Sequence, residues 1–196
     1  MDNWRNLLDE DILKGNVNFA ALFVLHFECL KDYIVTQVRD FYCDVSIKDG
    51  ELYSEETEKY KIEVRALENN IENASLRWFI NEEAITEEDY DLYQRLRKKR
   101  NDITHELLKK LNDGFNESDE KLYISLLELY RKIDKWWINQ IEIPISGEDI
   151  PDDYDPEQVC GGQALVLSMI NDIIFDNNKE YYKNLLDELR KLGIVT

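Results

Sequence analysis

One short segment of the chain, "RNDITH" at residues 100–105, combines residue types that could cleave a phosphodiester. The guanidinium of Arg100 could offer a planar pair of N–H donors to phosphate oxygens as negative charge builds up. The imidazole of His105 could help to move protons near pH 7. With RNA as the substrate the attacking group is already present, because the 2′-hydroxyl can attack the adjacent phosphate. Asn101 lies four residues before His105, on the same side of a helix, and could orient the imidazole or a phosphate oxygen.

The segment ends a basic run in an otherwise acidic chain. The formal net charge is −18, yet residues 95–110 hold seven of the 24 Lys and Arg residues and only two of the 42 Asp and Glu residues. The overall charge disfavours general affinity for nucleic acids. The basic run could pair with acids one helical turn earlier, such as Asp91, or it could guide RNA towards an acidic protein. The two interpretations are compatible.

The order Arg100, Asn101, His105, with four residues between the Arg and the His, resembles the signature of ribonuclease-type members of the HEPN family (higher eukaryotes and prokaryotes nucleotide-binding). The resemblance rests on these six residues and on a helical setting over about residues 16–143. It implies a metal-independent endoribonuclease without a cofactor, in which two copies of the chain pair as a homodimer and both motifs meet in one cleft. It also implies a role in toxin–antitoxin or abortive-infection defence, with RNA as the substrate, and allows for a protein antitoxin or regulator as a further partner.

For this chain the resemblance assigns catalysis to Arg100, Asn101 and His105, with His105 as acid and base and Arg100 as the phosphate-binding group. The nearby side chains that we expect to contact RNA are Arg97, Lys98 and Thr104. Some HEPN toxins carry a Tyr two residues after the His, which a nucleotidyltransferase antitoxin modifies. That position is Leu107 here, which argues against this mode of silencing but not against another kind of protein antitoxin.

A second hypothesis is a non-catalytic protein that keeps the same fold. The strong negative charge motivates it, because acidic surfaces can occupy basic sites on partner proteins. Such a chain would be an acidic helical binding protein or an antitoxin-like protein. A purified protein that cuts no RNA, yet co-purifies with a basic partner, would favour this hypothesis.

Other residues with chemical potential have structural explanations. His26 falls on an apolar helix face and is expected in the core, and Trp136 and Trp137 fit core or dimer packing better than stacking on bases. The dipeptide Gly161-Gly162 beside Cys160 is too short for a phosphate-binding loop. A group of loop acids lacks the spacing and glycine of an EF-hand and is expected to be solvated: Glu148, Asp149, Asp152, Asp153 and Asp155.

The helix that carries the motif is predicted over about residues 86–112, with Thr86 as a capping-type start. At about 100° per residue, the aliphatic residues of one stripe are Leu92, Leu96, Ile103, Leu107 and Leu111. Arg100 falls within this stripe, and His105 lies ~140° around the helix from it. Because a buried unpaired arginine is costly, either Arg100 reaches a polar cleft between helices, or the helix deforms near Asn101, or Arg100 snorkels from the edge of the core.

The rest of the chain predicts further helices and no convincing strand. They span Asn3 to about Leu13 with an end near Gly15, Asn18–Tyr42, Ser54 (N-cap) to about Ile80 with a break near 69–73, about 116–143 with Asn116 as cap and Pro144 as end, Asp155 (N-cap, before Pro156) to about Asn177, and Lys179–Lys191. We expect an all-α, antiparallel, HEPN-like bundle in a single domain, 1–196. Its core would cover about 16–143, and extra C-terminal helices would cover about 155–192.

Composition suggests a cytoplasmic protein without a membrane partner. The first residues are acidic where a signal peptide needs a basic and then an apolar run, and the longest apolar stretch, Phe19–Phe27, is too short to span a bilayer. Cys29, Cys43 and Cys160 fit neither a disulfide framework nor a zinc site. We therefore expect no metal site.

Overall fold

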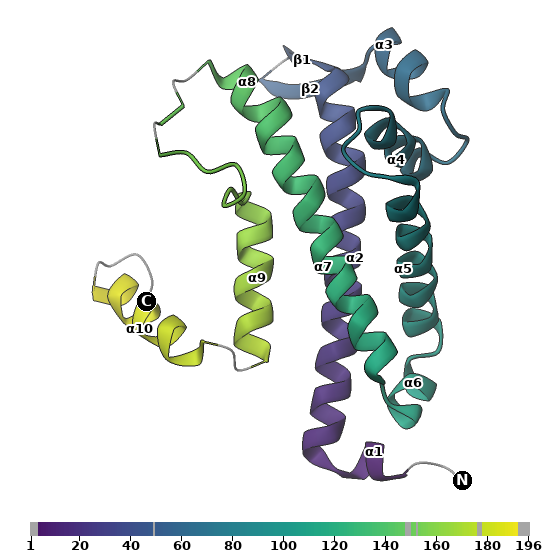
Figure 1. Cartoon of the computed structure of the whole chain (residues 1–196), viewed down its shortest axis with the longest axis vertical. Helices are drawn as coiled ribbons and strands as arrows, with labels where there is room; N and C mark the ends of the chain where they lie inside the picture. Colours follow the sequence, from purple (N-terminus) through teal and green to yellow (C-terminus); the bar gives the residue numbers. More distant parts are fainter. Residues whose placement is uncertain (1–3, 49, 148–149, 152, 176–177, 192–196) are drawn as a thin grey trace.

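The fold is organised around one long helix, α2 (Glu10–Tyr42), which runs along most of the molecule (Figure 1). The computed structural model describes residues 4–48, 50–147, 150–151, 153–175 and 178–191. Helix α7 (Glu117–Trp137) crosses α2, and α5 (Glu87–His105) packs against both. Helix α9 (Gly162–Ile174) contacts α2 and α7 on the side away from α5. The predicted all-α class is confirmed.

Shorter elements complete the chain, most of them at the two ends of this bundle (Figure 1). They are α1 (Trp4–Leu8), β1 (Cys43–Lys48), β2 (Glu51–Glu56), α3 (Glu58–Tyr60), the π-helical η1 (Lys61–Arg65), α4 (Ile71–Asn81), α6 (Leu107–Asp113), the π-helical η2 (Ile138–Glu142), α8 (Ile143–Ser146) and α10 (Lys179–Lys191). The strands and α4 lie at one end of α2, and α1 and α6 lie at the other (Figure 1). In the part of the chain that the structure describes, no helix combines the length and the apolar character needed to cross a bilayer.

Helix α2 is longer than the sequence predicted because a strong start and a continuous apolar face support it. The side chain of Asp9 caps the helix and accepts hydrogen bonds from the backbone N–H groups of Asp11 and Ile12. The buried positions recur every three or four residues: Phe19, Ala20, Leu22, Phe23, His26, Phe27, Leu30, Tyr33, Ile34, Val38 and Tyr42. The expected helix end near Gly15 is wrong, since one glycine costs a helix only about 1 kcal/mol and the cap and packing outweigh it.

A β-hairpin follows α2, so the expectation of a chain without strands is also wrong. Strand β1 pairs antiparallel with β2 along its whole length. Gly50, in the connection, has a φ of 84°, in the left-handed region that glycine adopts at no steric cost. Ser54, expected as a helix cap, lies in β2 instead. Thr57 takes over as the cap of α3, where its side chain accepts from the Tyr60 N–H at 3.2 Å.

Two predicted helix boundaries near the C-terminal part lie elsewhere. Pro144 does not end the helix, because it sits in the first turn of α8, where its missing N–H costs little. The end comes at Gly147, whose φ of 67° is left-handed. Asp155, where we expected a helix to begin, forms a turn. Helix α9 starts only after the extended residue Gly161, whose N–H donates to the buried Asp134 carboxylate at 2.8 Å.

Candidate functional site

Arg100 lies on the face of α5 that packs against α2, and it has a partner there. Its Nε and Nη2 both donate to Oε1 of Glu28 in α2, and its Nη1 donates to Oδ1 of Asn101 at 2.8 Å. The guanidinium carbon lies 5.5 Å from the centre of the Phe27 ring, within reach of a cation–π contact. The Arg100 side chain is 25% exposed. Arg100 therefore reaches a polar cluster between α2 and α5, and α5 stays helical past Asn101.

Glu28 is shared between Arg100 and Lys31, which lies one turn later in α2. Burial raises the pKa of the Glu28 carboxyl, but hydrogen bonds from Lys31 and Arg100 outweigh burial and lower the pKa overall. A carboxyl whose pKa is lowered in the folded state stabilises the fold at pH values above its ordinary pKa of 4.5. This contribution is lost as the pH falls from 4.5 through the native pKa.

Replacing Glu28 by glutamine should therefore destabilise the protein at neutral pH and not in acid. We expect Glu28→Gln to lower the free energy of unfolding by about 1 kcal/mol at pH 7, because the partly exposed Arg100 loses a charged acceptor. The difference from wild type should shrink as the pH falls from 4.5 through the lowered pKa of Glu28, because the carboxyl then becomes protonated. Urea unfolding at both pH values measures this. Asp32→Asn is the matched control, since Asp32 is exposed and 3.6 Å from Lys31; an equal loss in both variants would contradict the assignment.

Glu28 is a site residue that sequence reasoning missed. It lies 72 positions before Arg100, and its acidic type and its spacing from Lys31 are common on helix surfaces. The only signal was indirect: an arginine within an apolar stripe requires an acceptor on whichever helix covers it. The sequence does not say which helix that is.

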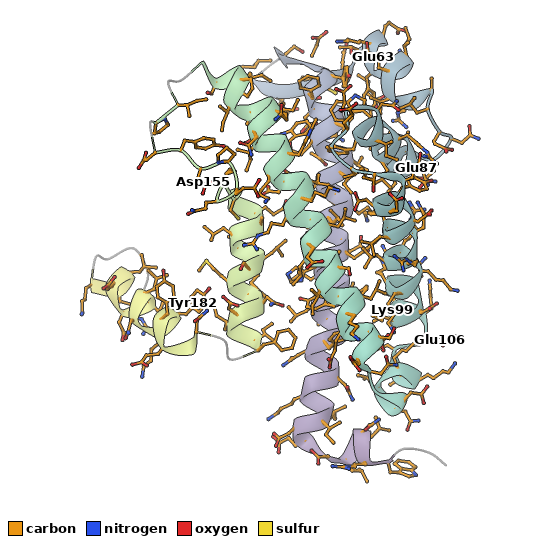
Figure 2. The ribbon with its side chains drawn as sticks, viewed as in Figure 1. Glu63, Glu87, Lys99, Glu106, Asp155 and Tyr182 are labelled. Carbon is orange, nitrogen blue, oxygen red and sulfur yellow. The ribbon has the colours of Figure 1, made fainter. Side chains whose placement is uncertain are left out.

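Most of the basic run pairs with acids on other helices. Arg97 binds Glu72 of α4 at 2.9 Å, and Lys99, labelled in Figure 2, binds Asp119 of α7. Together with Arg100, these bases link α5 to each of the three helices around it. Pairing with acids one turn earlier on α5 itself is not found among the described residues.

The three side chains predicted to contact RNA are differently placed. Lys98 is exposed, as is its neighbour Arg95, and neither forms an ion pair within the described part of the chain. Thr104 is exposed, but its hydroxyl donates to the backbone oxygen of Arg100 at 2.7 Å. Arg97 is committed to Glu72. Lys98 and Arg95 are thus the cations of the run that remain available to an incoming polyanion.

His105 is the last residue of α5, and it is exposed. No hydrogen bond of its ring is found among the residues described, and the Asn101 oxygen, which could have oriented the ring, accepts from Arg100 instead. The ring is therefore accessible to a second molecule, and a partner to orient it must come from outside this arrangement.

Helix α5 stops at His105, so the predicted continuous helix to about residue 112 is wrong. Glu106, labelled in Figure 2, has φ −121° and ψ 31°, outside the helical range, and α6 begins at Leu107. The break turns Leu107 of the predicted apolar stripe outwards, whereas Leu111 at the end of the stripe is buried. Leu107 is 43% exposed and Leu108 is 82% exposed. Two exposed leucines therefore lie two and three residues after His105.

The other candidates of the sequence lie in the core or in loops. His26 is buried, as is Trp137, and Trp136 packs among aromatic rings. Residues 148, 149 and 152 of the acidic loop lie outside the described residues. Within those that are described, no group of three or more His, Cys, Asp or Glu side chains could hold a metal ion.

Comparison with known proteins gives no precedent for this site. No protein-family model, no curated protein and no solved structure matches the chain. The functional argument therefore rests on the residues and their geometry.

Proposed function

We propose that this chain is a metal-independent endoribonuclease of the HEPN type that acts as a homodimer. The observation that supports it most is the state of Arg100. Within the described residues, Glu28 and Asn101 engage three of the five N–H groups of the guanidinium. One N–H remains on each terminal nitrogen, and a guanidinium can offer a pair of N–H donors to two oxygens of a phosphate. Glu28 would then hold the guanidinium while its outer edge binds substrate.

A second copy is needed because Arg100 and His105 of one chain face different ways. They are five positions apart in the helix, which separates them by ~140° around the axis and ~7.5 Å along it. Arg100 faces α2, whereas His105 is exposed. A second chain could bring its histidine to the arginine of the first and receive the same in return, as a two-fold interface allows. The exposed Leu107 and Leu108 beside His105 offer the apolar contact that such pairing needs.

In this site each side chain would have one task. Arg100 would bind the scissile phosphate and stabilise the charge that develops on it. His105 would take the proton of the attacking 2′-hydroxyl or give one to the departing 5′-oxygen, which leaves a cyclic phosphate and a 5′-hydroxyl. Arg95 and Lys98 would attract the RNA backbone to an acidic protein. By resemblance, the setting would be toxin–antitoxin control or antiviral defence, with a protein antitoxin or regulator.

Arg100→Lys tests the role of the guanidinium without removing its charge. Lysine can pair with Glu28, but its three N–H groups radiate from one nitrogen and cannot form the planar pair of donors that matches two phosphate oxygens. We expect cleavage of a labelled single-stranded RNA in buffer with EDTA to slow about a hundredfold, while light scattering still reports a dimer.

Arg95→Lys is the matched control for this experiment. Arg95 is exposed on the same helix and has no ion pair among the described residues, so its replacement by another cation should change the rate less than about twofold. Full activity of Arg100→Lys would remove bidentate phosphate binding from the mechanism.

The non-catalytic alternative is favoured by the same ion pair. If Arg100 serves only to join α5 to α2 through Glu28, the chain needs no substrate, and its charge of −18 would serve to bind a basic partner. Wild-type protein that is dimeric and folded but cuts no RNA would support this alternative over the nuclease.

A further inference from the structure

A groove between α7 and α9 is lined in part by a buried imidazole, that of His26. Helix α9 lies on the side of the bundle away from α5 (Figure 1). The volume of the groove is about 320 Å³. Ile124 and Leu165 line it and are about half exposed, which places them at the rim, while His26 of α2 is only 3% exposed. The charged lining residues Glu128 and Arg131 are exposed and so belong to the mouth.

The Nδ1 edge of the His26 ring has hydrogen-bond partners. Nδ1 lies 2.8 Å from the backbone oxygen of Leu22, and a carbonyl only accepts, so Nδ1 carries the proton. The Tyr123 hydroxyl donates to Oδ1 of Asn171 at 2.6 Å. At 3.2 Å from Nδ1, its oxygen can therefore only accept from that nitrogen. The proton of the neutral ring is thereby fixed on the Nδ1 edge.

The opposite edge of the ring is unmatched. Nε2 has no hydrogen-bond partner among the described residues. Burial lowers the pKa of His26 more than the nearby carbonyls of Leu22 and Leu167 raise it, so the ring is neutral at pH 7 and Nε2 presents a bare lone pair. His26 and Leu167 both line the groove, and the backbone carbonyl of Leu167 in α9 lies near the ring. A buried acceptor without a donor is unfavourable.

We propose that this groove binds a small uncharged molecule with an apolar body and one hydroxyl group, which donates to Nε2 of His26. Ile124, Leu127 and Leu165 suit an apolar body, and the volume is at the lower end of ligand sites, which fits a single ring. An ammonium donor would place a charge against apolar walls, so a neutral hydroxyl is favoured. Such a ligand would contact α7 and α9 together and hold the C-terminal helices to the bundle.

Phenol and toluene test the proposal as a pair, because they share a shape and differ in the hydroxyl. The chain has two histidines, so ¹⁵N NMR of labelled imidazoles resolves His26 easily. We expect phenol to shift the Nε2 resonance of His26, and toluene to bind about tenfold more weakly because it leaves Nε2 unmatched. Absence of phenol binding, or equal affinity for the two molecules, would overturn the proposal.

Variants of the groove test whether the probes bind at this site. Ile124→Trp fills the rim from an exposed position and should abolish phenol binding in a folded protein, whereas Ile62→Trp, exposed elsewhere, should leave it intact. His26→Phe keeps a ring without the acceptor, so phenol and toluene should bind alike. If His26→Phe does not fold, the wild-type preference and Ile124→Trp still decide, and unchanged binding in Ile124→Trp would refute the site.

Discussion

Replacing His105 by alanine should slow RNA cleavage in buffer with EDTA by about a thousandfold, the typical loss for a general acid–base group. The reason is specific to this chain. Its only other histidine, His26, is buried with its proton held towards Leu22, so no second imidazole can replace His105. Because the side chain is exposed and makes no hydrogen bond among the described residues, its removal should leave the melting temperature unchanged.

Glu106→Gln is the control for this prediction. Glu106 follows His105 directly, pairs only with Lys109 at 3.1 Å in the described structure, and is also exposed, so the change alters the local charge without touching the imidazole. Its cleavage rate should stay within about threefold of wild type. Equal rates in wild type and a highly purified His105→Ala protein would exclude His105 from catalysis, whatever the oligomeric state.

The parts of the fold that could be predicted are those with local causes. Thr86 and Asn116 each begin a helix through a capping box, with Asp89 and Asp119 as the reciprocal acceptors, and these signals lie within four residues of sequence. The helix break before α4 also has a local signal, because the Asn70 side chain caps α4. Element boundaries that depend on packing were missed. Nothing near Gly15 reveals that the helix continues, because the buried face that sustains it begins at Phe19.

The candidate site also has one part that local sequence predicts and another that depends on helix packing. Helical periodicity correctly placed Arg100 on the side of α5 that packs against the bundle, and it required a polar partner for the guanidinium. It could not identify Glu28, since ion pairs between helices depend on how those helices are stacked. The same limit applies to Lys99 with Asp119. The sequence therefore indicated that Arg100 faces the bundle and needs an acceptor, and packing determined which acceptor it has.

Trp78→Ala should be the most destabilising of the substitutions considered, at about 3–5 kcal/mol of unfolding free energy. Trp78 in α4 is almost completely buried, and its ring lies within 6.2 Å of Phe41 and Trp137, from the ends of α2 and α7. Its Nε1 also donates to the Tyr42 hydroxyl at 2.9 Å. Alanine would open a cavity where three helices meet and remove a buried donor. Urea unfolding followed by circular dichroism measures the loss.

Trp4→Ala is the matched control, because Trp4 is 60% exposed and its truncation should cost less than about 0.5 kcal/mol. Similar losses in the two variants would contradict the central position of Trp78. Helices α4 and α6 lie at opposite ends of α5 (Figure 1), so the aromatic cluster is remote from His105. Below its lowered melting temperature, Trp78→Ala should therefore keep the cleavage activity that His105→Ala loses, because stability and the proposed chemistry depend on different ends of the same helix.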